Sequence, residues 1–194
     1  DSESRGLGDV YKRQVVNWYK SNGRHDLPWR KNISPYSIWI SEIMLQQTQV
    51  KTVVPYFNKF IEKYPNLDAL LKASEDEILA QWSGLGFYRR AKNIYKACRV
   101  ISKDFNNKLP ININELESLP GIGRSTAGAI MSIAFNEGHP ILDANVKRVL
   151  GRYKKISFKT ENEKQKKLWL ISEKLTPNKE SFEYTQGIMD LGAM

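Results

Sequence analysis

Cysteine and histidine are almost absent from this chain. Of its 194 residues one is a cysteine, Cys98, and two are histidines, His25 and His139. One cysteine forms neither an intrachain disulfide nor a thiolate metal cluster, and two histidines far apart in sequence leave little material for a metal site or a Ser-His-Asp arrangement. The chain therefore offers no metal-ligand set, and its low cysteine content fits a reducing compartment.

Long apolar runs are missing as well. No stretch of the sequence reaches the length that spans a bilayer, and residues 1–14 have no apolar centre of the kind found in signal peptides. We therefore expect no membrane partner and no secretion. The expected location is the cytoplasm or nucleoid of a bacterium, or the nucleus or mitochondrion of a eukaryote.

The two ends of the chain differ from the rest. Ser, Gly and mixed charges predict that residues 1–14 are disordered or foreign to the protein. Residues 188–194 stop inside an apolar stretch that has no capping signal, so we expect truncation at the C-terminus. The folded region is then residues 15–194.

Acidic residues are outnumbered by basic ones. The chain has 30 Lys and Arg against 21 Asp and Glu, which gives a formal net charge of +9. This balance favours a polyanionic partner such as DNA or RNA, although many basic proteins never contact nucleic acid.

Signals for β-strands are scarce, whereas apolar residues recur at helical spacing almost everywhere. With 41% hydrophobic residues the chain can bury a sizeable core, so we expect an all-α fold. Cys98 falls on an apolar helical face and is expected to be an inert core thiol. The predicted helices are residues 14–21, a helix from Pro35 with Trp39, Ile43 and Val50 on one stripe, a capped helix from Ser74, and residues 89–105, 126–135 and 168–175, with a solvated return along 154–167.

A glycine-rich turn follows a short helix that begins near Glu115. Gly121 and Gly123 allow backbone conformations that other residues avoid, so the turn can aim several N–H groups outward at the start of the next helix. A phosphate group fits such a helix start. The same pattern also fits a plain turn between two helices.

Two carboxylates have the right character for bond cleavage. Glu42 lies on an otherwise apolar stripe, where burial without a partner raises its pKa and keeps it protonated near neutral pH. Asp143 precedes a helical segment, and helix capping is an ordinary explanation for it. Glycosidic cleavage nevertheless requires such a pair, an acid for the leaving group and an anion facing an oxocarbenium-like centre.

Four segments resemble one family. They are residues 39–50 (WISEIMLQQTQV), 84–88 (GLGFY), 119–128 (LPGIGRSTAG) and 141–149 (ILDANVKRV). On these motifs the chain is similar to the MutY family of adenine DNA glycosylases, within the helix-hairpin-helix glycosylase superfamily. The resemblance covers about residues 15–194 and implies an all-α, two-lobed fold with the hairpin unit at about 115–135.

This resemblance implies an activity and a set of site residues. Members remove adenine mispaired with 8-oxoguanine or guanine, and flip the adenosine out of the duplex into a pocket between two lobes of a monomer. By position Glu42 matches the acid that protonates adenine N7, Asp143 the carboxylate that stabilises or captures the sugar cation, and Asn145 a residue that orients the site. The implied DNA contacts are Gln46, Gln47, Thr48, Gly86, Phe87, Tyr88, Gly121, Gly123, Arg124, Ser125 and Lys147.

Two positions within this set bear on specificity and on reaction type. Phe87 falls at the aromatic wedge that is usually Tyr, so stacking is kept and a hydroxyl is lost. Ser125 falls where related lyases such as endonuclease III carry the Schiff-base Lys, which favours a monofunctional glycosylase. Lys147 can still trap an abasic site adventitiously. The alternatives are an endonuclease III-like lyase on damaged pyrimidines, against which Ser125 and Glu42 argue, and an inactive DNA-binding module.

The resemblance also implies parts that this chain does not contain. The family binds a 4Fe-4S cluster through four closely spaced cysteines, which we expect just beyond Met194. A C-terminal Nudix-like domain that reads 8-oxoguanine is expected further on.

Overall fold

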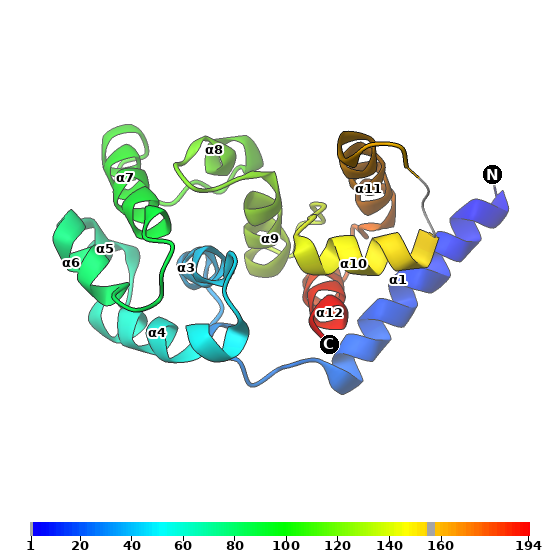
Figure 1. The fold of residues 1–194 in the computed structure, drawn as a ribbon, viewed down its shortest axis with the longest axis horizontal. Helices are drawn as coiled ribbons and strands as arrows, with labels where there is room; N and C mark the ends of the chain where they lie inside the picture. The colour runs from blue at the N-terminus through cyan, green and yellow to red at the C-terminus, as the bar shows by residue number, and fades with distance from the viewer. Residues whose placement is uncertain (1, 155–157) are drawn as a thin grey trace. The chain divides into compact units, whose positions relative to one another are not determined.

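The computed structural model describes residues 2–154 and 158–194, and every regular element in these ranges is a helix. This confirms the all-α class (Figure 1). None of the helices in the described ranges is long and apolar enough to cross a membrane. The helices are α1 (Ser2–Asn22), α2 (Pro28–Lys31), α3 (Pro35–Leu45), α4 (Val50–Lys63), α5 (Leu67–Leu71), α6 (Glu75–Gln81), α7 (Arg89–Asp104), α8 (Ile113–Ser118), α9 (Arg124–Ala134), α10 (Ala144–Lys154), α11 (Glu161–Leu175) and α12 (Ser181–Ala193).

The chain divides into two compact units, which confirms the expected two-lobed organisation. The first unit combines the residues up to His25 with Met131–Met194, and the second is Asp26–Ile130. The boundary between them falls inside the sequence of α9.

The second unit is built around large aromatic side chains. Trp39 of α3, Phe60 of α4 and Trp82 after α6 are fully buried. The rings of Phe60 and Trp82 meet edge to face with their centroids 6.0 Å apart, an arrangement that the ring quadrupoles favour. α7 covers this core with an apolar face that includes Cys98, whose thiol pKa is raised by burial to about 12. The prediction of an inert core thiol is therefore confirmed.

The first unit is organised around α12. This helix packs against both α1 and α10. Small residues allow the close approach, because a Cβ on Gly187 would meet Tyr19 and Val15 of α1, and a Cβ on Gly192 would overlap the Asn145 backbone of α10. Gly192 therefore brings the end of α12 directly against the first turn of α10.

Capping explains where two of the helices begin. The hydroxyl of Ser74 accepts a hydrogen bond from the Glu77 amide, and the Glu77 carboxylate accepts one from the Ser74 amide. This reciprocal box confirms the cap predicted for the helix from Ser74. A second box, between Ser34 and Ser37, starts α3.

The structure corrects three expectations from the sequence. Residues 2–14, expected to be disordered, continue α1, because Tyr11 is buried and its ring lies 4.3 Å from that of Tyr153 in α10. The stripe predicted to run to Val50 breaks at Leu45, and Val50 begins α4. The helix predicted over 168–175 begins earlier, at Glu161 of α11, so residues 161–167 of the predicted solvated return are helical, although none of them is buried; residues 155–157 lie outside the described ranges.

Candidate active site and nucleic-acid interface

The glycine-rich turn connects α8 to α9 within the second unit. Asn112 caps α8 by accepting hydrogen bonds from the amides of Asn114 and Glu115. Leu119 and Ile122 are buried on either side of the turn. The two apolar anchors fix the turn to the core and direct the N-terminal turn of α9 outward, where a helix dipole favours an anion.

The two glycines of this turn have different reasons to be glycine. Gly121 has φ 83°, and a Cβ there would lie 2.8 Å from Cβ of Asn93 in α7, so both the backbone and the packing require glycine. Gly123 does not have a positive φ, and a Cβ there would meet no protein atom within 4 Å. The expectation that Gly123 supplies an unusual backbone conformation is therefore wrong. Its lack of a side chain instead leaves the start of α9 open.

A cavity of about 370 Å³ lies between the loop after α3 and the turn before α7. Four residues predicted as DNA contacts, Gln46, Gln47, Phe87 and Tyr88, are among those that line it. Gln46 also extends toward the glycine-rich turn, with its Nε2 3.4 Å from the Gly121 carbonyl oxygen. The structure thus brings three of the four motifs together within one unit.

The remaining predicted contacts in this unit are not lining residues of the cavity. The hydroxyl of Thr48 donates to the Gln46 carbonyl at 3.4 Å, and Gly86 presents its carbonyl oxygen to Arg90. Arg124 is exposed and Ser125 half-buried, both in the first turn of α9.

Arg90 is the residue that sequence analysis missed in this region. The residue is 7% exposed, and its guanidinium donates to five main-chain carbonyl oxygens, those of Ile43, Met44, Gln46, Gly86 and Phe87. Burial lowers the pKa of this guanidinium. A sequence signal was present, because Arg90 lies four residues before Ile94 on the apolar stripe of α7.

Glu42 lies in α3, between the buried residues Ser41 and Ile43. Its side chain is half-buried and not without partners, so it is not the fully buried, unpaired carboxylate that the apolar stripe predicted. Glu42 sits in the last turn of α3, which ends at Leu45. Glu42 belongs to the second unit.

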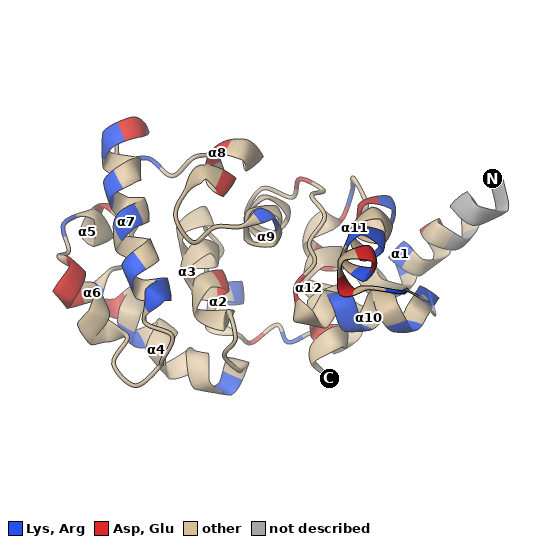
Figure 2. Cartoon of the chain, turned by 45° about the horizontal axis from the view of Figure 1, so that its top comes forward, with Lys and Arg blue, Asp and Glu red and all other residues tan. Residues whose placement is uncertain are grey.

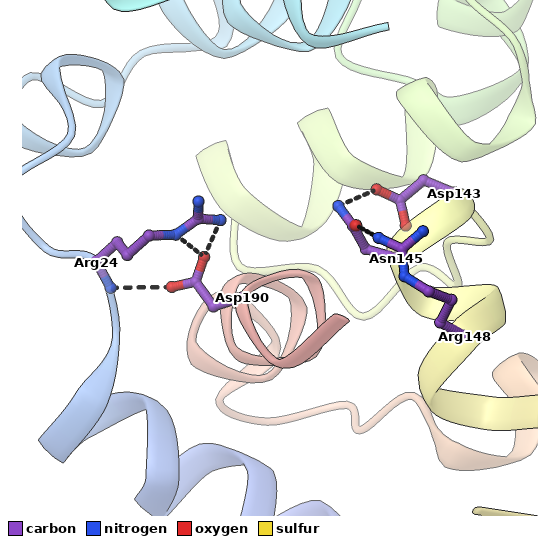
Figure 3. Close-up of polar contacts among 5 residues, drawn as sticks. All are labelled: Arg24, Asp143, Asn145, Arg148 and Asp190. Atoms are coloured by element: carbon purple, nitrogen blue, oxygen red, sulfur yellow. Dashed lines mark hydrogen bonds and ion pairs between the residues drawn. The ribbon is translucent and has the colours of Figure 1, made fainter. Parts of the chain in front are cut away.

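Asp143 belongs to the first unit and caps α10. Its Oδ1 accepts a hydrogen bond from the Val146 amide at 2.8 Å, so the expectation that Asp143 caps a helix is confirmed. Its other oxygen, Oδ2, lies 3.5 Å from Nδ2 of Asn145 (Figure 3). Burial raises the pKa of Asp143, although the amides of Val146 and Asn145 and the charge of Arg148 act in the opposite direction.

Asn145 is held on its other side by Arg148. The Arg148 guanidinium donates through Nη2 to Oδ1 of Asn145 and through Nε to the Gly192 carbonyl at 2.9 Å. An amide whose oxygen accepts from a guanidinium has its NH₂ group directed the other way, here toward Asp143 (Figure 3). Asp143, Asn145 and Arg148 therefore form one connected set on α10, and the half-buried Lys147 lies between them in sequence.

An ion pair that the sequence did not predict anchors α12. Asp190 is fully buried and accepts three hydrogen bonds from Arg24, at 2.9 Å from the amide and 2.8 and 2.6 Å from the guanidinium (Figure 3). Such a paired, buried carboxylate fixes the register of α12, and with it the position of Gly192 against α10.

The side chains present do not fit an iron–sulfur cluster. Four cysteine thiolates are needed, and the one cysteine of the chain is buried in α7. Within residues 2–154 and 158–194 no group of three or more His, Cys, Asp or Glu side chains could hold a metal ion.

An all-helical chain with a glycine-rich turn between α8 and α9, and with an Asp that caps the later helix α10, has the features of a helix-hairpin-helix protein. Residues 40–174 match the HhH-GPD superfamily of base excision DNA repair proteins, and the chain belongs to this family.

Relatives and solved structures agree with this assignment. The chain is 50% identical over 186 residues to an adenine DNA glycosylase of Buchnera aphidicola from Schizaphis graminum, which covers 95% of this chain and 54% of the relative. It is 51% identical over 185 residues to the adenine DNA glycosylase of the Buchnera strain from Acyrthosiphon pisum, with coverage of 95% and 53%. A solved thermostable thymine-DNA glycosylase superposes with a TM-score of 0.83 at 29% identity, over 100% of this chain and 88% of that one. The chain spans about half the length of the two curated relatives.

Proposed function

We propose that this chain is the catalytic region of a monofunctional DNA glycosylase that hydrolyses the N-glycosidic bond of adenine mispaired with 8-oxoguanine or guanine. The observation that carries the proposal is the identity of 50% to a relative named adenine DNA glycosylase, over 95% of this chain. The proposed partner is double-stranded DNA, bound by a monomer in the compartment that holds the genome.

In this proposal the two carboxylates have different tasks. The target adenosine is flipped out of the stack, because its glycosidic bond is inaccessible inside the duplex. Glu42 donates a proton to the adenine and makes it a better leaving group, and ionised Asp143 faces the positive charge that develops on the sugar. The connected set of Asn145 and Arg148 supports this role for Asp143, because it fixes the carboxylate on the first turn of α10.

The proposed DNA contacts fall into two groups. The start of α9, with Gly123, Arg124 and Ser125, binds a backbone phosphate, and Lys147 contributes charge at α10. The cavity residues Gln46, Gln47, Phe87 and Tyr88, together with Thr48 and Gly86, contact the bases around the mismatch. Ser125 supplies a hydroxyl where a Schiff-base mechanism requires an amine, which supports release of the base without cleavage of the strand.

A duplex assay tests this function. The chain is incubated with duplexes that carry adenine opposite 8-oxoguanine, adenine opposite guanine, or thymine opposite guanine, and abasic sites are measured with and without alkali. We expect release of adenine and strand breaks only after alkali. Strand breaks without alkali through a borohydride-trappable intermediate would replace the monofunctional assignment by a lyase. Release of thymine alone would replace the proposed activity by that of a thymine-DNA glycosylase, as in the superposed structure. Binding without release of any base would indicate an inactive DNA-binding module.

The Glu42→Gln variant tests the proposed acid. We expect base release to fall by about 10²- to 10⁴-fold, because the amide cannot donate the proton, while mismatch affinity stays within about twofold. Glu62→Gln makes the same chemical change at an exposed position of α4 and is expected to leave release unchanged. Near-normal release by Glu42→Gln would remove Glu42 from this role.

A further inference from the structure

Two loops of the second unit each hold a non-glycine residue in the left-handed backbone region. Gln47, after α3, has φ 58°, and Phe87, before α7, has φ 50°. A bulky residue such as Phe rarely adopts this conformation, and it persists only where surrounding contacts fix it. Phe87 is also 56% exposed, so packing of its own side chain into the core does not explain the conformation.

The contacts that fix both loops come from one side chain. Nη1 of Arg90 lies 2.6 Å from the carbonyl oxygen of Met44 and 2.7 Å from that of Gln46, at the end of α3. Nη2 lies 3.1 Å from the carbonyl of Gly86, and Nε lies 3.4 Å from that of Phe87. The guanidinium thus joins the residue before Gln47 to Phe87 itself.

Arg90 has no carboxylate partner in the described part of the chain, only these carbonyl oxygens and the rings of Trp82 and Phe87. A buried cation without a counter-ion is costly to desolvate, so a stable core alone does not favour arginine here. The guanidinium carries several N–H donors in a fixed planar arrangement, which suits it to hold two separate backbone segments at once.

The cavity of about 370 Å³ lies where these two loops meet, and Arg90 is one of its lining residues. Its volume falls within the range of about 300–1,000 Å³ typical of small-molecule sites. The exposed ring of Phe87 stands 5.4 Å from the guanidinium. An aromatic face beside polar side chains such as Gln46 and Gln47 suits an unstacked nucleobase.

We propose that Arg90 is a positioning residue that locks the loops of Gln47 and Phe87 into one rigid receptacle for the purine opposite the excised base. The inference rests on the proposed function, because it takes DNA as the ligand of this face. A loop that is already ordered loses less conformational entropy when it binds, so Arg90 acts on DNA affinity through Gln47 and Phe87 without contacting the glycosidic bond.

The test measures the opposite base directly and does not depend on excision. A duplex carries a fluorescent guanine analogue opposite a non-hydrolysable adenosine analogue, and the fluorescence change on unstacking is recorded at saturating protein. Arg90→Lys keeps the charge but cannot reach both loops with a fork of donors. We expect the fluorescence change to fall at least about fivefold, and mismatch affinity to weaken about tenfold.

Two further variants complete the design. Arg90→Met removes the donors altogether and is expected to give the same loss. Arg99→Met is the matched control, because Arg99 lies on the same helix and donates to a single carbonyl, that of Leu71 at 2.6 Å. Its fluorescence change is expected to equal that of the unaltered chain, and circular dichroism checks the helix content of every variant.

The outcomes separate this inference from the proposed function. An unaltered fluorescence change in Arg90→Lys would overturn the positioning role even if adenine is released normally. Unfolding of both Arg90 variants would overturn it too, because Arg90 would then be a residue of the fold. A fluorescence change that depends on Arg90, in a chain that releases no adenine from any duplex, would support the receptacle and reject the proposed activity.

Discussion

The Asp143 carboxylate is held by an amide of its own helix while burial raises its pKa. A folded-state pKa above the unfolded value means that the folded chain binds this proton more tightly than the unfolded chain does. The free energy of unfolding therefore falls as the pH rises through the window just above the ordinary pKa of 3.8. At neutral pH the ionised carboxylate is therefore a cost to stability.

Asp143→Asn separates capping from charge. The amide oxygen can still accept from the Val146 amide, so we expect a melting temperature at neutral pH equal to or above that of the unaltered chain. Base release should fall by about 10²- to 10³-fold, because no anion faces the developing cation. The measurements are thermal unfolding at pH 7 and single-turnover release of adenine.

Asp143→Ala is the companion variant. It loses the cap as well as the charge, at a cost of about 1 kcal/mol, and its melting temperature should fall by about 2–4 °C. If Asn and Ala lower the melting temperature equally, the cap contributes nothing. If Asn leaves base release intact, Asp143 is a structural residue only.

At the scale of elements, the two glycines of the glycine-rich turn, which are separated by Ile122, are expected to have different roles. Gly121 faces α7 and is fixed by its φ and by Asn93, whereas Gly123 faces open space at the start of α9. A phosphate that approaches the α9 amides closely has to pass where a Gly123 side chain would stand. Gly121 is therefore required by the fold, whereas the role expected of Gly123 is to leave room for the proposed phosphate.

Alanine at each position distinguishes these roles. Gly121→Ala is expected to destabilise the chain by about 2–3 kcal/mol, through the positive φ and the overlap with Asn93, and to lower the melting temperature by about 5–10 °C. Gly123→Ala is expected to change stability by less than about 1 kcal/mol and to weaken duplex DNA binding about tenfold, the worth of one hydrogen bond to a charged group. Equal DNA affinity for Gly123→Ala and the unaltered chain would show that the start of α9 does not bind phosphate.

Elements that depend on local signals were predictable from the sequence. The Ser74–Glu77 box, the long apolar stripe of α7 and the glycine-rich turn were expected and are present. Residues 2–14 were not, since the partner that orders Tyr11 is Tyr153, far along the chain. The position of Arg90 on the apolar stripe of α7 indicated burial, but its partners are distant backbone carbonyls, including those of Ile43 and Met44 in α3, which sequence alone does not identify.

In the candidate site, too, local features were predictable from the sequence and long-range contacts were not. That Asp143 caps a helix was readable from its own neighbours, and the structure contains the cap. The orientation of Asn145 toward Asp143 was not readable in this way. Arg148 fixes it, and Arg148 is itself held by the Gly192 carbonyl of α12, a helix that is distant in sequence. Catalytic roles for Glu42 and Asp143 rest on resemblance and stay predictions.

For the whole molecule, the dominant property is the excess of positive charge. The formal net charge is +9, and basic residues repeat along the exposed face of helices such as α7 (Figure 2). Such a field draws a polyanion from any direction and adds affinity without sequence preference. In the proposed function, mismatch recognition depends on the local geometry of the loops and the turn, so we expect binding through total charge and binding through specific contacts to respond differently to salt.

The salt dependence of duplex binding separates these two contributions. We expect the logarithm of the association constant to fall linearly with the logarithm of salt concentration, and Arg124→Met to reduce the slope by about 0.9, as for the loss of one phosphate contact. The change should be the same for matched and mismatched duplexes, because a phosphate carries no sequence information. Lys103→Met, in the last turn of α7, removes the same charge away from the turn and serves as the control, with an expected slope close to that of the unaltered chain. Equal changes in slope for both variants would mean that the field of the whole chain, rather than the start of α9, determines where the duplex binds.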